Sequence, residues 1–400
     1  MNAPKVLIAG GGIGGLATAL TLLQHGFDVA VYEQSSELRE VGAGIQISPN
    51  GNRVLDHLGV LAKLQSLSSP TQGKEIRLWN TGQSWKLFDL GQAAIDKYGF
   101  PYMTVFRPHL LQVLADAVRA LQPDAIHLNA RCQSVTQTDT EVTLTFEDGR
   151  SATGDVLVGA DGLHSKIRTA LFGAQAPDFS GMVAWRALIP MHKLPAHMAR
   201  PIATNWVGPG GHVVHYPLNG GEVMNFVGIL EGNTWTSAPW STPGTVQACH
   251  EAFEGWHADV HTMMDHAPSF SKWALCGKPP LAHWSQGRAT LLGDACHPTL
   301  PFLAQGAVFT LEDAIVLQRC LRHDGDDVVR ALQRYESARL ERAYRMVQGA
   351  RDNTTRFHNQ VLAHPQEAQD FIQREWQQTA IGSRYDWLFT YDAMTAAIER

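Results

Sequence analysis

Cysteine is scarce in this sequence of 400 residues, and the five cysteines are scattered, odd in number and free of CxxC spacing. This usage indicates a reducing compartment, so we expect a cytoplasmic protein. It also argues against a metal cluster or a redox-active dithiol, and we expect no metal ion. The cysteines are Cys132, Cys249, Cys276, Cys296 and Cys320.

An excess of positive charge and a long apolar run are also missing. The formal net charge is −6 and there is no basic tract, so nucleic acid is not expected as a main partner. No apolar run reaches the roughly 18 residues of a membrane span, and no charged-then-apolar leader precedes the first strand pattern. The chain has no internal repeat, and its 44% hydrophobic content predicts a folded protein of two or three lobes without a membrane anchor.

The first informative pattern in the sequence is KVLIAGGGIGGLATALTLLQHGFDVAVYE, residues 5–33. Residues 6–9 read as a short buried parallel strand that stops at glycine. Gly10, Gly12 and Gly15 have G-x-G-x-x-G spacing, in which the glycines give a tight turn, room for a pyrophosphate and close helix packing. The N-terminus of the following helix, with its unpaired N–H groups, would face the phosphate. The segment predicts a dinucleotide site rather than an ordinary glycine-rich turn.

Glu33 ends the second apolar run of this segment. A carboxylate in this place accepts hydrogen bonds from a ribose 2′-OH and repels a 2′-phosphate, which disfavours NADP in the site. FAD and NAD both fit the pattern up to this point.

Periodicity further along the chain predicts an α/β fold with a discontinuous organisation. Helices are expected over 48–69, 107–122, 306–322 and 326–352, and strands over 76–106, 126–160, 180–232 and 289–293. We predict a Rossmann-like nucleotide-binding domain from residues 1–75, 107–175 and 281–322. A β-rich domain would be inserted as residues 76–106 and 176–280, and residues 323–400 would form C-terminal helices with an aromatic tail.

Two later motifs resemble each other. DVLVGADGLHSKIR (155–168) and RATLLGDACHPTLPFLAQGAVFTLEDA (288–314) each carry a short buried strand that runs into glycine and aspartate. Asp161 or Asp294 alone could cap a helix or a turn. Both together, after strands, favour a site where a backbone approaches a ligand and a carboxylate takes hydroxyl donors. GPGG at 208–211 does not lead from a strand into a helix, so no second dinucleotide domain is predicted.

These three motifs, in this order, resemble the fingerprints of the single-component FAD-dependent aromatic hydroxylases, which have the fold of p-hydroxybenzoate hydroxylase. The resemblance covers nearly the whole chain. It implies a GxGxxG Rossmann-like FAD-binding domain, an inserted β-rich substrate domain and a C-terminal helical region. It also implies FAD as the cofactor, NAD(P)H as a co-substrate without a domain of its own, and ring hydroxylation with O2 through a C4a-hydroperoxyflavin.

The resemblance also implies roles for individual residues. In the family pattern, the pyrophosphate is held by Gly10, Gly12 and Gly15, and the adenosine ribose is held by Glu33. Arg107 bonds the phosphate and ribitol region of FAD, and Asp294 binds the ribitol. Asp161 serves both FAD and NAD(P)H. In the same pattern, the N1/O2 side of the flavin faces Gln305, Gly306 and Ala307. The flavin ring lies beside residues 42–45, with Arg39 nearby. Pro298 belongs to the loop over the reacting face of the flavin.

The substrate side is expected in GGHVVHYPLNGGEVMNFVG, residues 210–228. Strand alternation points His212, Val214 and Tyr216 one way. The H-x-x-x-Y-P pattern resembles the substrate-side strand of 3-hydroxybenzoate 6-hydroxylases and, more loosely, of salicylate hydroxylases. We expect His212 to be the base or the hydrogen-bond partner of a phenol, and Tyr216 to be a second hydrogen-bonding group. The alternative is that His212 is a structural histidine on the strand. Arg186 could meet a substrate carboxylate or be a solvated strand residue.

We therefore predict an FAD-dependent monooxygenase that hydroxylates a small phenolic acid similar to 3-hydroxybenzoate, with NAD(P)H and O2. Alternatives are a decarboxylating hydroxylase of salicylate or 6-hydroxynicotinate, a flavin reductase or dehydrogenase of the same fold without oxygen transfer, and a non-catalytic nucleotide-binding module. A homodimer is the assembly considered. His297 and Cys296 are interpreted as structural, and the pair His257 and His261 lacks the third ligand of a zinc site.

Overall fold

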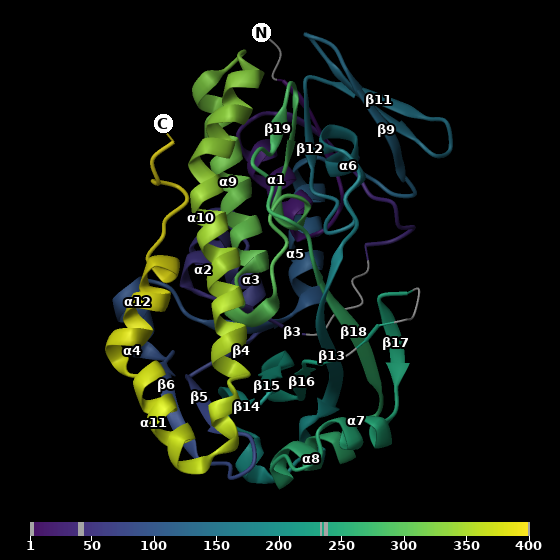
Figure 1. Ribbon diagram of the computed structural model, residues 1–400. Helices are drawn as coiled ribbons and strands as arrows, with labels where there is room; N and C mark the ends of the chain where they lie inside the picture. The colour runs from purple at the N-terminus through teal and green to yellow at the C-terminus, as the bar shows by residue number, and fades with distance from the viewer. Residues whose placement is uncertain (1–3, 39–43, 233, 236–238, 399–400) are drawn as a thin grey trace.

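A computed structural model describes residues 4–38, 44–232, 234–235 and 239–398 (Figure 1). Arg39, Gly42 and Ala43, which were assigned to the flavin side, lie outside the described residues. Two main sheets organise the described chain, and the long helix α10 (Val328–Phe357) runs from one to the other in Figure 1.

The first sheet has six strands in the order β19-β20-β12-β1-β2-β8, parallel except for the pair β19 and β20. Ala9 at the end of β1 lies opposite Tyr32 and Gly159, and Gly159 lies opposite Leu291. The residues that follow these four strand ends therefore meet at one edge of the sheet. The bounds are β1 Lys5–Ala9, β2 Asp28–Tyr32, β8 Ile126–His127, β12 Val156–Gly159, β19 Ser285–Gln286 and β20 Ala289–Leu291.

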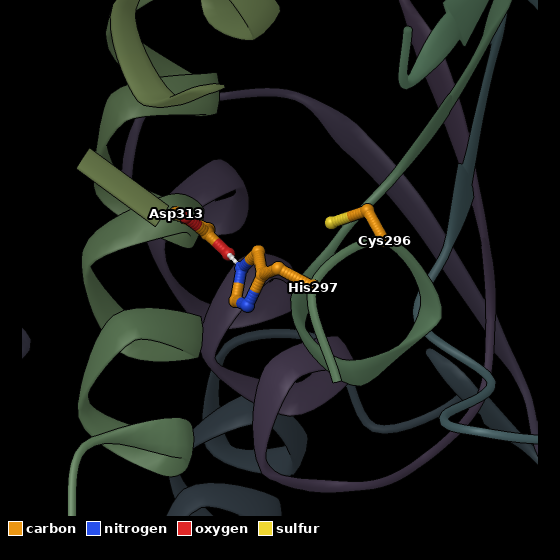
Figure 2. Close-up of side chains that lie close together, drawn as sticks. All are labelled: Cys296, His297 and Asp313. Carbon is orange, nitrogen blue, oxygen red and sulfur yellow. Dashed lines mark hydrogen bonds and ion pairs between the residues drawn. The ribbon is translucent and has the colours of Figure 1, made fainter. Parts of the chain in front are cut away.

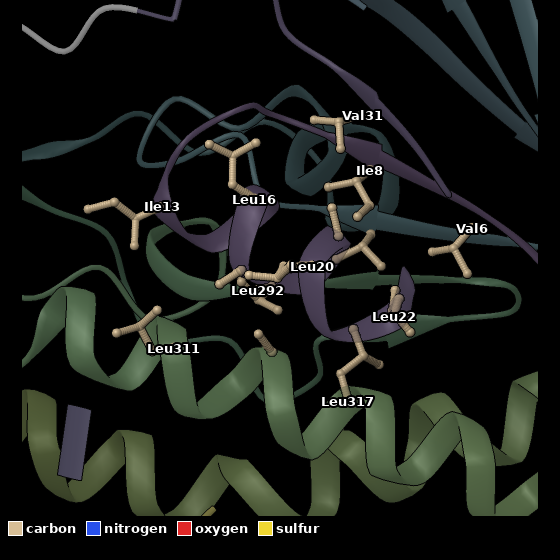
Figure 3. Packing of buried hydrophobic residues seen from close by; sticks show 14 of the residues in the cluster. Val6, Ile8, Ile13, Leu16, Leu20, Leu22, Val31, Leu292, Leu311 and Leu317 are labelled. Carbon is tan, nitrogen blue, oxygen red and sulfur yellow. The ribbon is translucent and has the colours of Figure 1, made fainter. Parts of the chain in front are cut away.

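Helices pack on this sheet through a continuous apolar core. Helix α1 (Ile13–Gln24) packs between the sheet and α9 (Gly306–Asp324), and Figure 3 shows Leu16 and Leu20 of α1 in one cluster with Ile8 and Leu317. The predicted helix over 107–122 is α5, and the predicted helix over 48–69 is two helices divided at Gly59, whose φ is +76°. The remaining helices near this sheet are α2 Pro49–His57, α3 Leu61–Gln65, α5 Arg107–Leu121 and α6 Lys166–Phe172.

The second sheet has eight strands in the order β17-β18-β13-β16-β15-β14-β5-β6, antiparallel except for the pair β14 and β5. Its strands come from two separate stretches of chain, residues 73–89 and 178–277. Helices α7 (Val246–Ala252) and α8 (Ala258–Asp265) pack against each other at its lower end in Figure 1. The bounds are β5 Gly73–Leu78, β6 Ser84–Asp89, β13 Asp178–Pro190, β14 Ile202–Gly208, β15 Gly211–Leu218, β16 Val223–Leu230, β17 Ser241–Gly244 and β18 Phe270–Gly277.

Two three-stranded sheets complete the β structure. One has the order β11-β10-β9 and the other β3-β7-β4. The stretch 76–106, expected as strands and loops, also contains helix α4 (Gln92–Tyr98), and its last strand pairs with β3 and β4 rather than with the eight-stranded sheet. The domain boundaries given above remain a prediction. The bounds are β3 Gly44–Ile47, β4 Ser69–Pro70, β7 Met103–Phe106, β9 Cys132–Gln137, β10 Val142–Phe146 and β11 Ser151–Gly154.

The C-terminal region is helical, with α11 (Pro365–Glu375) and α12 (Gln378–Phe389) after α10. The aromatic tail packs on its own chain: the ring centroids of Tyr385 and Phe88 are 4.9 Å apart, and those of Phe389 and Tyr98 are 5.3 Å apart. Among the described helices, none combines the length and apolar character needed to cross a membrane.

Replacing Gly15 with alanine should destabilise the nucleotide-binding part. A Cβ atom at Gly15 would lie 1.9 Å from the carbonyl oxygen of Gly10, so α1 would have to move away from β1. We expect Gly15→Ala to lower the free energy of unfolding by about 1–3 kcal/mol, measured by urea denaturation without added nucleotide. Gly12→Ala is the control, since no atom lies within 4 Å of its Cβ position. Equal stability of the two variants would contradict this packing.

Candidate functional site

A cavity of about 770 Å³ joins the carboxyl edge of the parallel sheet to one face of the eight-stranded sheet. It brings together most of the residues predicted for the site. The predicted residues that line it are Gly10, Gly12, Glu33, Arg107, Asp161, Arg186, His212, Tyr216, Asp294, Gln305, Gly306 and Ala307. Gly15 lies beneath the turn, and Pro298 is buried next to the lining residue Thr299 rather than lining the cavity itself.

The glycine turn after β1 has the geometry of a phosphate cradle. Gly10 has φ +109°, a conformation that favours glycine, and Gly12 has open space where a Cβ would stand. Gly12 is also the N-cap of α1, so the free N–H groups of the first helical turn face the same space. The turn can therefore accept a pyrophosphate.

Glu33 is held in place by backbone amides. Its Oε2 accepts a hydrogen bond from the N–H of Gly11 at 2.8 Å, and its Oε1 accepts one from Ser35 at 2.8 Å. Each carboxylate oxygen keeps a further lone pair, and the residue lines the cavity. Glu33 can thus accept ribose hydroxyls at the end of β2.

The two aspartates of the later motifs have different environments. Asp161 Oδ1 accepts from the hydroxyl of Ser165 at 2.5 Å, and its Oδ2 accepts from the N–H groups of Lys166 and Ile167, so it caps α6 while it lines the cavity. The carboxylate of Asp294 is exposed and has no hydrogen-bond partner within the described ranges. Asp294 is therefore free to receive hydroxyl groups of a ligand, whereas Asp161 also has a structural task.

The N-terminus of α9 is fixed against the cavity by buried amides. Ala304 has φ +54° and turns the chain into the helix. Gln305 Oε1 accepts from Asn50 Nδ2 at 3.2 Å, while its Nε2 donates to Ser48 Oγ at 2.9 Å. The first N–H groups of α9, at Gly306 and Ala307, thereby face the cavity with the positive end of the helix dipole.

Buried ion pairs hold α9 to α10, and the sequence did not reveal them. The charges of RYESARLERAYR, residues 334–345, have the spacing of pairs along one helix. In the structure Arg339 is fully buried and bonds Asp313 at 2.7 Å and Glu312 at 2.9 Å. Arg342 adds a 2.9 Å contact to Glu312, which also accepts from Asn50 at 2.8 Å. The adjacent acids in TLEDA, one to two turns inside a predicted buried helix, were the available signal of a buried ion pair.

Cys296, His297 and Asp313 form a compact buried group, and Figure 2 shows the ring of His297 pointing at Asp313. His297 Nε2 lies 2.6 Å from Asp313 Oδ2, while Arg339 occupies the other oxygen. Burial opposes the charged imidazole, but Cys296 and Asp313 outweigh it and raise the pKa of His297 well above its usual range. The guanidinium beside the carboxylate would repel a cation, so the group is better described as an ion-paired support of α9 than as a metal centre.

Two cations on the sheet face of the cavity have no counter-charge within the part of the chain that the structure describes. Lys74 of β5 and Arg186 of β13 line the cavity, and neither forms an ion pair or hydrogen bond with a described residue. The guanidinium of Arg186 lies 5.0 Å from the ring centroid of Trp273. Burial lowers the pKa of Lys74 to about 8. The sequence pointed to Arg186 but gave no signal for Lys74, whose neighbours in QGKEIRL look like an ordinary strand.

His212 and Tyr216 lie on one side of β15 and face the cavity, as strand alternation predicted, while His215 contacts Met224 instead. His212 Nδ1 lies 2.6 Å from His358 Nε2. Burial, His358 and Lys74 together lower the pKa of His212 well below its usual range. Burial raises the pKa of the Tyr216 phenol, which Arg186 partly offsets. Both side chains therefore stay neutral near pH 7 and can form hydrogen bonds with a ligand.

A model of the FAD binding domain family matches residues 3–350 of the chain. The chain is 37% identical to a 3-amino-4-hydroxybenzoate 2-monooxygenase of Streptomyces platensis, with 89% of each protein covered. It is 33% identical to a 3-hydroxybenzoate 6-hydroxylase of Polaromonas naphthalenivorans, with 89% of this chain and 88% of the relative covered.

A solved structure of HpxO from Klebsiella pneumoniae, complexed with FAD and uric acid, has a similar fold. The TM-score is 0.84 at 26% identity, and 97% of each chain is covered. The open turn at Gly12 and the acceptors Glu33 and Asp294 fit the pyrophosphate and hydroxyl groups of such a dinucleotide.

Replacing Arg339 with methionine should strongly destabilise the protein. The change leaves Asp313 and Glu312 buried with fewer positive partners, and breaking a buried ion pair costs about 3–5 kcal/mol. Chemical denaturation measures the loss. Arg330→Met is the control, because Arg330 is 66% exposed and lies on the same helix. A loss no larger for Arg339→Met than for the control would contradict a supporting role.

Proposed function

Because the chain belongs to the family of FAD-dependent aromatic monooxygenases, we propose that it hydroxylates a small phenolic acid similar to 3-hydroxybenzoate, with NAD(P)H and O2 as co-substrates. The predicted fold class, the FAD cofactor and the enzyme class are confirmed by the family match and the FAD-complexed neighbour. The substrate, its orientation and the roles of individual residues are the content of the proposal.

The observation that carries the proposal is the pair of cations Lys74 and Arg186 in the cavity. A charge that is half-buried in a cavity wall without a partner is costly, so a site that keeps two of them gains when an anion enters. Arg186 has the planar geometry that suits a carboxylate, and Lys74 contributes a compact positive charge. A small carboxylic acid is therefore the ligand class that this side of the cavity favours.

His212 and Tyr216 would bind the ring hydroxyl of the acid. His212 is neutral and can accept the hydroxyl proton, and Tyr216 can hydrogen-bond the oxygen. An ionised hydroxyl makes the ring richer in electrons. Deprotonation at His212 therefore prepares the substrate for an electrophilic oxygen.

The FAD would lie along the carboxyl edge of the parallel sheet, where Gly10, Gly12 and Glu33 receive the adenosine diphosphate and Asp294 the ribitol. When bound, it takes electrons from NAD(P)H and activates O2 for transfer to the ring. The N–H groups of Gly306 and Ala307 would stabilise negative charge on the flavin.

Apolar side chains close the cavity around the ring position. Val214, Val227 and Ile229 line it from the sheet, and Phe302 and Phe357 line it from the loop before α9 and from α10. Such a lining excludes water, which protects a reactive oxygen species from unproductive decay. A reductase or dehydrogenase without oxygen transfer has no need of this protection.

A substrate screen should give the first test. Incubating the FAD-loaded protein with NAD(P)H and 3-hydroxybenzoate, salicylate or 6-hydroxynicotinate should produce O2 uptake that depends on the acid. Mass spectrometry should find a product with one added oxygen, and loss of CO2 would identify a decarboxylating reaction. NAD(P)H oxidation that yields a hydrogenated product without O2 consumption would refute the proposal.

Replacing Lys74 with methionine should weaken binding of the acid by about 10- to 100-fold, the value of a charge-assisted hydrogen bond of roughly 1.5–3 kcal/mol. In the wild type, affinity should fall as the pH rises through about 8, because Lys74 then loses its proton. In Lys74→Met this fall should be absent. Titration of FAD fluorescence with the acid between pH 6 and 9 measures both effects.

The matched control is Lys86→Met on the neighbouring strand β6, where the side chain is 72% exposed. It should bind like the wild type at every pH. An unchanged pH profile in Lys74→Met would exclude the lysine from the binding of the acid.

A further inference from the structure

A chain of hydrogen bonds leads from the cavity to the surface through His358 and Glu231. His212 Nδ1 lies 2.6 Å from His358 Nε2, and His358 Nδ1 lies 2.6 Å from Glu231 Oε1. His212 and His358 are buried, whereas the side chain of Glu231 is 42% exposed. Neither His358 nor Glu231 was singled out from the sequence, since they lie far apart along it.

The backbone fixes this chain of side chains in place. Gly210 donates its N–H to the carbonyl oxygen of His358 at 3.0 Å and accepts the N–H of Glu231 at 2.9 Å. One residue of the turn before β15 thus holds the end of α10 and the end of β16 together. The ring of His212 also packs against Phe302 and Phe357, at centroid distances of 4.9 and 5.2 Å.

The carboxylate at the surface end determines the direction of every hydrogen bond. Glu231 can only accept, so Nδ1 of His358 carries the hydrogen. In a neutral His358 the Nε2 atom is then an acceptor, and His212 must donate from Nδ1. A neutral His212 therefore presents a lone pair at Nε2, which has no partner within the described parts of the chain.

We propose, on the basis of the proposed function, that His212, His358 and Glu231 form a proton relay that removes the proton of the substrate hydroxyl to the solvent. The hydroxyl gives its proton to Nε2 of His212, and the Nδ1 hydrogen of His212 moves to Nε2 of His358. The Nδ1 hydrogen of His358 moves to Glu231, which releases it to water. The substrate becomes the phenolate, and proton return from solvent restores the chain after product release. His358 and Glu231 are positioning residues that act through His212.

The charges around the relay support this direction. The titratable groups that face His212 are Lys74 of β5 and His358, and both lower its pKa together with burial. Burial also lowers the pKa of His358, while Glu231 opposes that effect through its hydrogen bond and charge. Both imidazoles are therefore neutral near pH 7, as an acceptor at His212 requires. Lys74 additionally favours a negative oxygen beside His212.

The test uses single-turnover hydroxylation by the FAD-loaded protein between pH 6 and 10, with the phenolic acid most active in the screen. His358→Gln keeps a hydrogen-bonding group beside His212 but cannot pass a proton on. We expect the rate at pH 7 to fall about 100- to 1,000-fold, with FAD binding unchanged. The rate should then rise about tenfold per pH unit towards the ordinary phenol pKa of about 10, whereas the wild type, saturated with the acid, should be level above pH 7.

Glu231→Gln is the second variant, and its surface position keeps the experiment informative if His358→Gln does not fold. The amide oxygen preserves the hydrogen bond to His358 but not the charge, so a smaller fall at pH 7 is expected, and the rate should again rise with pH. A fluorinated analogue of the acid, ionised at pH 8 without help, should restore most of the lost rate in both variants. The controls are His215→Gln on the opposite face of β15 and the exposed Glu254→Gln, which should behave as the wild type.

Three outcomes would count against the relay. Variants with the rate and pH profile of the wild type would show that the chain carries no proton. Variants that are slow at every pH and with the fluorinated acid would show a structural role alone. A wild-type protein that yields no hydroxylated product from any phenolic acid would overturn the proposed function, and the relay with it.

Discussion

The site depends on the buried ion pairs between α9 and α10. Glu312 and Asp313 lie one to two turns inside α9, and Arg339 and Arg342 hold them from α10. Asn50 joins the same network and also bonds Gln305, so the position of the helix N-terminus is tied to the ion pairs. If these contacts were lost, the amides of Gly306 and Ala307 would no longer have a fixed direction. A helix end can stabilise charge on a ligand only when it is held in this way.

Electrostatics divides the cavity into two regions that suit two different ligands. At the edge of the parallel sheet, backbone amides receive phosphate, and carboxylates at Glu33 and Asp294 receive hydroxyl groups. On the face of the eight-stranded sheet, Lys74 and Arg186 provide positive charge among apolar walls. The first region fits the FAD of the family, and the second fits a small aromatic acid. Because α10 contacts elements of both regions, it couples the support of the cofactor helix to the end of the relay at His358.

The sequence predicted what depends on local order along the chain. Parallel strands followed by glycine and acid placed Gly10, Glu33, Asp161 and Asp294 at one edge, and alternation along β15 placed His212 and Tyr216 on one face. Contacts between distant segments could not be predicted in this way, because periodicity gives the buried face of an element but not its partner. The sequence therefore gave no sign that Arg339 pairs with acids of α9, and His358 and Glu231 carried no signal. Lys74 was missed because only the structure shows that it lines the cavity without a counter-charge among the described residues.

The most direct measurement of the central claim is a crystal structure of the protein with FAD and 3-hydroxybenzoate bound. The account predicts the carboxylate of the acid within ion-pair distance of Arg186 or Lys74 and the ring hydroxyl within hydrogen-bond distance of His212 Nε2. The isoalloxazine ring should lie between the acid and the N-terminus of α9. An acid bound with its carboxylate away from both cations, or its hydroxyl turned away from His212, would contradict the account.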